Sequence, residues 1–144
     1  MKVKERIPMR EQDPAERIRN FKSVPYGYSA KEAIAEANRC LQCKNPMGET
    51  GCPVRRKVKQ IIKDITAKKF KEAFLLSKAD NAVPAMTGRV CPQETQCEGK
   101  CILEKQGKAI NIGKLFAFVA DWARNKSIEA KLEIRDKPKK VAVV

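Results

Sequence analysis

Hydrophobic residues recur at intervals of three and four along most of this chain, a spacing that places them on one face of a helix. The pattern predicts two amphipathic helices, or one kinked helix, over residues 54–78, and another helix over residues 111–126. The apolar positions are Val54, Val58, Ile61, Ile62, Ile65, Phe70, Ala73, Phe74 and Leu76, then Ile112, Leu115, Phe116, Val119 and Trp122. No alternating strand pattern precedes Lys137, so we expect an all-α fold up to that point.

Two helices nearer the N-terminus are predicted from their starting signals. An Asp-Pro pair opens residues 13–21, which is typical of a helix N-terminus, and Ile18 and Phe21 would share one face of that short helix. Residues 29–40 open with a Ser-x-x-Glu capping box and continue as an Ala-rich run. This second helix is expected to end at Cys40 and to lead into a group of cysteines.

Two further stretches are predicted not to be helical. Residues 79–92 contain Asn81, Pro84 and Gly88, which break helices, and we expect a loop there. Residues 139–144 read KKVAVV and predict a short strand after a Lys-Pro-Lys-Lys turn. Because a lone strand has no partner in an otherwise helical sequence, we expect the chain to be a fragment that stops at the start of a β-containing domain.

The composition indicates a modest apolar core and a basic surface. Aromatic residues make up 6% of the 144 positions and charged residues 33%, so another source of stability would help to hold the fold. Lys and Arg number 31 against 17 acidic residues, which gives a net charge of +14. Such a balance favours an acidic partner, an anionic cofactor or nucleic acid, unless it is simply a solvated surface.

The chain contains no histidine, which excludes histidine general bases, mixed Cys/His zinc sites and histidine-ligated haem. The N-terminal sequence has no apolar run of the kind found in signal peptides, and no stretch is long and apolar enough for a membrane span. We therefore expect a cytoplasmic protein with no membrane partner. Cytoplasmic thiols stay reduced, so clustered cysteines there are more often metal ligands than disulfides.

All six cysteines fall in two groups of three. Their spacings are C-x2-C-x8-C in residues 40–52 and C-x5-C-x3-C in residues 91–101. A C-x2-C pair lets two thiolates reach one metal centre, and the Cys-Pro pairs resemble those of ferredoxin cluster loops. Cationic residues, which lower thiol pKa and offset the charge of a thiolate-ligated cluster, surround both groups: Lys44, Arg55, Arg56, Lys57, Arg89 and Lys100.

Three other interpretations of these cysteines remain open at this point. A single cysteine can be a small buried apolar residue, although two groups of three make that reading weaker. Four of the six thiolates could form a zinc site, but structural zinc sites normally use two C-x2-C pairs and only one is present. Disulfides would need an oxidising compartment, for which the sequence gives no sign.

Three stretches of the chain resemble a known family of iron-sulfur domains. They are AEANRCLQCKNPMGETGCPV at residues 35–54, NAVPAMTGRVCPQETQCEGKC at residues 81–101 and INIGKLFAFVADWA at residues 110–123. In this order they are similar to the N-terminal domain of the glutamate synthase small (β) subunit, of dihydropyrimidine dehydrogenase and of the FAD subunit of NAD(P)H-dependent ferredoxin:NADP oxidoreductases. The resemblance implies a helical domain, of the α-helical ferredoxin type, with two [4Fe-4S] clusters.

The resemblance also implies which cysteines serve each cluster. The two implied ligand sets are Cys40, Cys43 and Cys101 for one cluster, and Cys52, Cys91 and Cys97 for the other. Two positions depart from the family. Gly48 stands where the family has a fourth cysteine, and Phe116 lies near the place of a ligating Glu or Gln. Each set then has three thiolates, with Glu49 and Glu98 close enough in sequence to be fourth ligands, so one or both clusters could be incomplete.

The resemblance extends to the domain organisation. Residues 1–28 would be an N-terminal arm with a short helix, residues 29–126 the double-cluster domain, and residues 127–144 a linker and the first strand of a missing Rossmann domain that binds FAD and NAD(P)H. The implied function is electron transfer between that FAD and a partner subunit, with ferredoxin as another candidate partner. The implied enzyme is the full-length NAD(P)H-dependent oxidoreductase, because this stretch offers no acid, base or nucleophile of its own.

The alternative function comes from the charge instead of the cysteines. A zinc-stabilised or metal-free basic helical module could bind an acidic protein or nucleic acid through its cationic surface. Nucleic acid is the less favoured partner, because aromatic residues that could stack on bases are few and Trp122 shares the predicted core face.

Overall fold

The computed structural model describes residues 5–130, and all the regular structure in that range is helical. The only strand-like pairing there is an isolated antiparallel bridge between Glu11 and Pro25. The helices are α1 Pro14–Arg17, α2 Ala30–Ala37, α3 Met47–Thr50, α4 Val58–Thr66, α5 Phe70–Ala79, α6 Pro84–Val90, the 3-10 helix η1 Ile102–Gln106 and α7 Ile112–Asn125. The predicted all-α class is thus confirmed, while the predicted strand at residues 141–144 lies outside the described residues.

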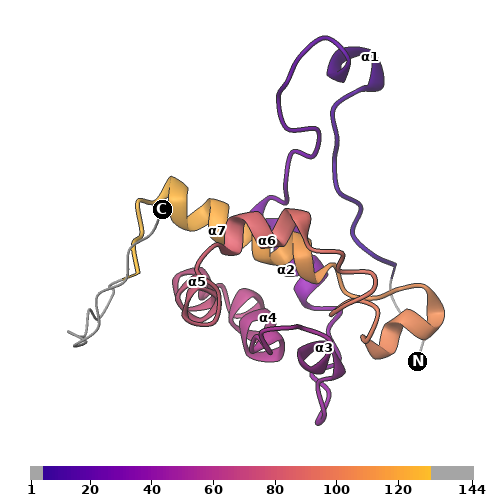
Figure 1. Cartoon of the computed structure of the whole chain (residues 1–144), viewed down its shortest axis with the longest axis vertical. Coiled ribbons are helices and arrows are strands. Elements are labelled where there is room, and N and C mark those ends of the chain that lie inside the picture. The colour runs from indigo at the N-terminus through magenta and orange to yellow at the C-terminus, as the bar shows by residue number, and fades with distance from the viewer. Residues whose placement is uncertain (1–4, 131–144) are drawn as a thin grey trace, which may run out of the picture.

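Helix α7 is the central element, and α2, α4, α5 and α6 all pack against it (Figure 1). Its face is fully buried at Leu115, Val119 and Ala123, as predicted from the sequence spacing. Helix α4 faces it with a buried Ile61-Ile62-Ile65 stripe. Burial of each such aliphatic side chain stabilises the fold by roughly 1.5–3 kcal/mol. Phe70 of α5 adds edge-to-face contacts with Phe118 and Trp122 of α7, at centroid distances of 5.1 and 5.4 Å.

The long amphipathic stretch at residues 54–78 forms two helices, which was one of the two predicted possibilities. The chain breaks at Lys68, whose φ of +60° lies in the left-handed region and cannot continue an α-helix. The prediction that the first helix includes Val54 is wrong, since α4 begins at Val58 and Val54 is exposed. Arg55, with φ of +47°, turns the chain between the cysteine loop and the helix.

The prediction of a loop over residues 79–92 is also wrong, because residues 84–90 form α6. Pro84 is the first residue of this helix, where its missing N–H costs nothing, so it starts the helix instead of breaking it. Gly88 lies against α7 so closely that a Cβ there would be 2.7 Å from the backbone nitrogen of Ala117. The glycine is therefore explained by the close crossing of the two helices and not by a turn.

The N-terminal arm carries α1 away from the other helices (Figure 1). Asp13 caps α1 as predicted, accepting a hydrogen bond from the Ala15 N–H at 2.8 Å, but the helix has only four residues. Ile18 and Phe21 lie beyond its end and are exposed, so the prediction that they share a helix face is wrong. The arm is ordered instead by Gln12, which is buried and donates to the Ser23 carbonyl at 2.9 Å.

Helix α2 begins with the predicted capping box, in which Ser29 and Glu32 each accept a hydrogen bond from the other's backbone N–H. The helix ends at Ala37, so Cys40 lies three residues beyond it, in the loop. No helix within residues 5–130 is both long and apolar enough to cross a bilayer.

Candidate metal centres

Three of the six cysteines line one cavity of about 560 Å³ between α3, α4 and η1. They are Cys40 and Cys43, in the loop after α2, and Cys101, the residue before η1. The apolar part of its wall comes mainly from Val58, Ile62, Ile110 and Ile112. Such a wall would keep water away from a group held by the thiols.

The other three cysteines line a second cavity, of about 170 Å³. Cys52 follows α3, Cys91 ends α6, and Cys97 lies in the loop before η1. Phe116 of α7 forms part of the wall. The fold thus sorts the cysteines into two sets of three, and each set combines thiols that are distant in the sequence.

All six cysteines are free thiols. Within residues 5–130, no three His, Cys, Asp or Glu side chains form a ligand set for a single metal ion. Ligands of one zinc ion converge to about 2.3 Å from it, whereas cluster ligands bind separate iron atoms and stand further apart. Three thiols around a largely apolar cavity therefore fit an iron-sulfur cluster in each place.

Burial keeps the free thiols protonated. It raises the pKa of Cys97 to about 12, and the neighbouring Glu98 and Cys52 add to the shift. Burial likewise raises the pKa of Cys40, and Cys101 and Cys43 act in the same direction. Since metals bind the thiolate, these cavities favour neutral thiols until a positively charged centre enters and displaces the protons.

The smaller cavity contains a buried cation that the sequence alone does not single out. Arg56 is only 3% exposed, whereas the five other basic residues noted around the cysteines are exposed. Its guanidinium lies 4.6 Å from the centre of the Phe116 ring and donates a hydrogen bond to Thr87 Oγ1 at 2.7 Å. Burial lowers the pKa of Arg56, while the Cys52, Cys91 and Cys97 thiols, if ionised, would raise it.

Gly48, in α3, belongs to the wall of the larger cavity. A Cβ placed there would lie 3.3 Å from the Cys97 carbonyl oxygen and 3.5 Å from Cδ1 of Ile112. Its φ is not in the left-handed region, so a small side chain meets a slight squeeze but no backbone strain. Position 48 is therefore beside the cavity of Cys40, Cys43 and Cys101, where the family resemblance would place another thiolate.

The two candidate carboxylate ligands differ in their surroundings. Glu49 lines the larger cavity, and its Oε1 accepts a hydrogen bond from the Lys59 N–H at 3.0 Å, in the first turn of α4. Glu98 lines neither cavity. Its Oε2 pairs with Arg6 at 2.7 Å and its Oε1 accepts from the Gly113 N–H at 3.1 Å. Both oxygens of Glu98 thus have structural partners, and the ligand role of either residue stays a prediction.

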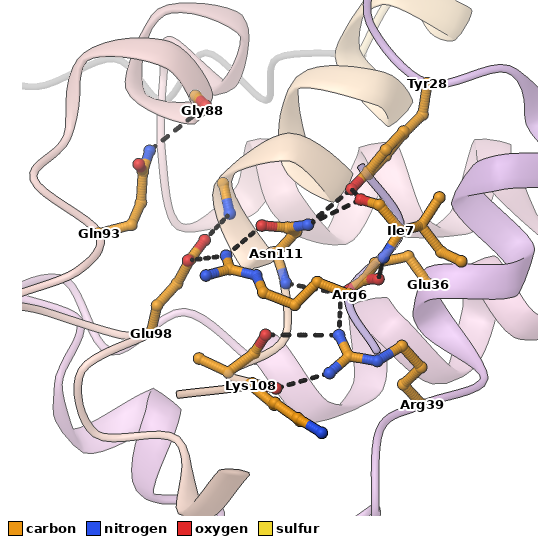
Figure 2. A network of polar contacts seen from close by, with 12 residues as sticks. Arg6, Ile7, Tyr28, Glu36, Arg39, Gly88, Gln93, Glu98, Lys108 and Asn111 are labelled. Carbon is orange, nitrogen blue, oxygen red and sulfur yellow. Dashed lines mark hydrogen bonds and ion pairs between the residues drawn. The ribbon is translucent and has the colours of Figure 1, made fainter. Parts of the chain in front are cut away.

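A buried polar network, which sequence reasoning missed, fixes the start of α7 beside both cysteine groups (Figure 2). Glu36 is fully buried and accepts hydrogen bonds from the Ile7 N–H at 2.8 Å and the Asn111 N–H at 2.9 Å. Arg39 pairs with Glu36 and donates to the Lys108 carbonyl at 2.6 Å. The only sequence signal is that two ionisable residues fall on the buried side of an Ala-rich helix.

Tyr28 joins the N-terminal arm to the same network. Its hydroxyl donates to the Ile7 carbonyl at 2.6 Å and accepts from Asn111 Nδ2 at 2.7 Å. Burial, reinforced by the nearby Glu36, raises the pKa of Tyr28 to about 12. The arm, α2 and α7 are therefore tied together by polar contacts that lie next to, and not inside, the two cavities.

Residues 17–128 match the family described as dihydropyrimidine dehydrogenase domain II, 4Fe-4S cluster. The chain is 36% identical over 114 residues to the glutamate synthase [NADPH] small chain of Halomonas elongata, covering 78% of this chain and 24% of that protein. It is 34% identical over 125 residues to the Escherichia coli glutamate synthase [NADPH] small chain, covering 86% and 26%. The NAD-dependent dihydropyrimidine dehydrogenase subunit PreT of E. coli is 34% identical over 97 residues, with coverages of 67% and 24%. The chain spans about a quarter of the length of these curated relatives.

Proposed function

This chain belongs to the dihydropyrimidine dehydrogenase domain II family of 4Fe-4S domains, and we propose that it carries electrons within a longer NAD(P)H-dependent oxidoreductase. The observation that carries the proposal is the division of six cysteines into two cavities, each lined by three thiols. Membership of a 4Fe-4S family does not favour the alternative of a zinc-stabilised or metal-free basic binding module.

We assign one cluster to each cavity. The proposed ligands are Cys40, Cys43 and Cys101 in the larger cavity and Cys52, Cys91 and Cys97 in the smaller. When bound, [4Fe-4S] clusters supply one-electron redox chemistry. The chain's own residues hold the thiols in place, exclude water with apolar walls and, through Arg56, bring a cation to the smaller cavity. Glu49 remains the better placed candidate for a fourth ligand, because it lines a cavity and Glu98 does not.

The remainder of the electron path is assigned to parts beyond these residues. We propose that residues 1–28 form an arm, residues 29–126 the cluster domain, and residues 127–144 the passage to a domain that binds FAD and NAD(P)H. The relatives named as a small chain and as a subunit support a partner subunit as the electron donor or acceptor. Nothing observed favours ferredoxin as that partner. A cytoplasmic location agrees with six reduced thiols.

The test is metal analysis of the complete protein after anaerobic purification and reconstitution. The proposal predicts iron and acid-labile sulfide in near equal amounts, and an electron paramagnetic resonance signal of a reduced [4Fe-4S] cluster after dithionite addition. Stoichiometric zinc without sulfide, in protein that resists reconstitution, would instead establish the zinc-stabilised alternative.

A further inference from the structure

Arg56 is a buried cation without a carboxylate at ion-pair distance among the described residues. Its polar contact is the neutral hydroxyl of Thr87, and its flat face lies over the Phe116 ring. Asp80 attracts it from further away. A buried charge lowers stability unless an anion compensates it, so the surroundings of Arg56 call for negative charge.

The groups able to supply that charge are the cysteines of the same cavity. Cys52, Cys91 and Cys97 line it together with Arg56 and Phe116. Each of these thiols would interact with Arg56 more strongly than Asp80 does. As free thiols they are neutral, and they become anionic only as ligands. The cation is thus suited to the ligated state of the smaller cavity.

The larger cavity has no equivalent buried cation among the described residues. The basic residues in its lining are Lys59, which is half-buried, and Lys100 and Lys105, which are exposed. Water and salt screen exposed charges strongly, whereas a buried charge acts at short range and low dielectric. The two cavities therefore present different electrostatic environments to groups of the same kind.

We propose that Arg56 is a positioning residue that raises the reduction potential of the cluster held by Cys52, Cys91 and Cys97, an inference that rests on the proposed function. One-electron reduction adds one negative charge, and the fixed guanidinium stabilises that charge by Coulomb attraction. The ring of Phe116 and the hydroxyl of Thr87 hold the guanidinium in place. The smaller cavity is then the preferred place for the electron.

The experiment compares Arg56→Gln with Arg55→Gln, its exposed neighbour, which removes the same charge. Both are made in the complete protein with Cys43→Ala, so that only the smaller cavity keeps its full set of cysteines. The midpoint potential is measured by dithionite titration followed by electron paramagnetic resonance. We expect Arg56→Gln to lower the potential at low and high salt alike, and Arg55→Gln to cause a much smaller shift that salt suppresses.

Arg56→Lys is the conservative variant, and it separates charge from shape. It should keep the potential close to that of the parent protein, because the charge is retained. If Arg56→Gln loses its cluster, the inference stands only when Arg56→Lys retains both the cluster and the parent potential. Equal potentials for Arg56→Gln and the parent, with normal iron content, would overturn this inference and leave the proposed function intact. Absence of any cluster in the Cys43→Ala parent would overturn both.

Discussion

The Glu98 carboxylate accepts a hydrogen bond from the backbone N–H of Gly113, with 3.1 Å between Oε1 and the nitrogen. Glu98 follows Cys97, and Gly113 is the second residue of α7, so this contact ties the second cysteine loop to the central helix. A carboxylate at this place also interacts favourably with the positive end of the helix dipole. The position of Cys97 therefore depends on α7 as well as on its own loop.

Replacing Glu98 tests this coupling. We expect Glu98→Ala to lower the free energy of unfolding of the apoprotein by about 1–3 kcal/mol, because it leaves the buried Gly113 N–H and Arg6 without their acceptor. Urea denaturation followed by circular dichroism measures the change. The control is Glu94→Ala, an exposed glutamate of the same loop. Equal stabilities of the two variants would show that Glu98 does not anchor the loop.

Adding a thiol at position 48 should complete the ligand set of the larger cavity. Gly48→Cys is expected to raise the iron bound per chain and to slow bleaching in air, because a fourth thiolate closes an open iron corner. Any [3Fe-4S] signal in electron paramagnetic resonance should give way to a reduced [4Fe-4S] signal.

Gly48→Ser is the matched control for that substitution. It introduces a side chain of similar size into the same 3.3 Å contact with the Cys97 carbonyl, but no thiolate. Serine should leave iron content and spectra close to those of the parent. If both variants behave like the parent in folded, reconstituted protein, position 48 is not beside a cluster.

The Glu36–Arg39 pair predicts a large effect on stability. Glu36→Gln removes the countercharge of Arg39 inside the protein and presents an amide to two backbone N–H donors. Breaking a buried ion pair from one side costs about 3–5 kcal/mol, so the apoprotein should unfold at a much lower urea concentration. Glu72→Gln, on the exposed side of α5, is the control and should unfold close to the parent. A small effect of Glu36→Gln would contradict the network in Figure 2.

Tyr28 predicts a loss of stability at alkaline pH. Its pKa rises from 10.0 in the unfolded chain to about 12 in the fold, so the folded state keeps a proton that the unfolded state releases. The stabilisation is complete below pH 10 and is lost as the pH rises from 10 to 12. Tyr28→Phe lacks this proton, and its stability gap to the parent should narrow over that range. With the exposed Tyr26→Phe as control, a gap that stays constant would refute the assignment.

The sequence predicted the elements whose stability comes from local signals. The capping box at Ser29 and the apolar stripe of α7 appear in the structure where the spacing placed them. Residues 84–90 were predicted as a loop because Pro84 and Gly88 are helix breakers in general. Their roles here, opening α6 and allowing it to approach α7, depend on a tertiary contact that no local pattern contains.

The site was predictable to a similar extent. The cysteine spacing indicates metal binding, and the family resemblance implied the two sets of three that the fold brings to separate cavities. The special place of Arg56 could not be predicted, because it differs from five neighbouring cations only in burial. The same holds for Glu98, whose two partners, Arg6 and Gly113, are distant in the sequence.

The most direct measurement of the central claim is the iron content of two single variants, one for each cavity. Cys43→Ala should remove the cluster of the larger cavity and Cys91→Ala that of the smaller, so each reconstituted protein should lose about half of the parent's iron and the double variant nearly all of it. Loss of all the iron in either single variant, with both proteins folded, would mean that the six cysteines serve one centre, and the assignment of two separate clusters would be wrong.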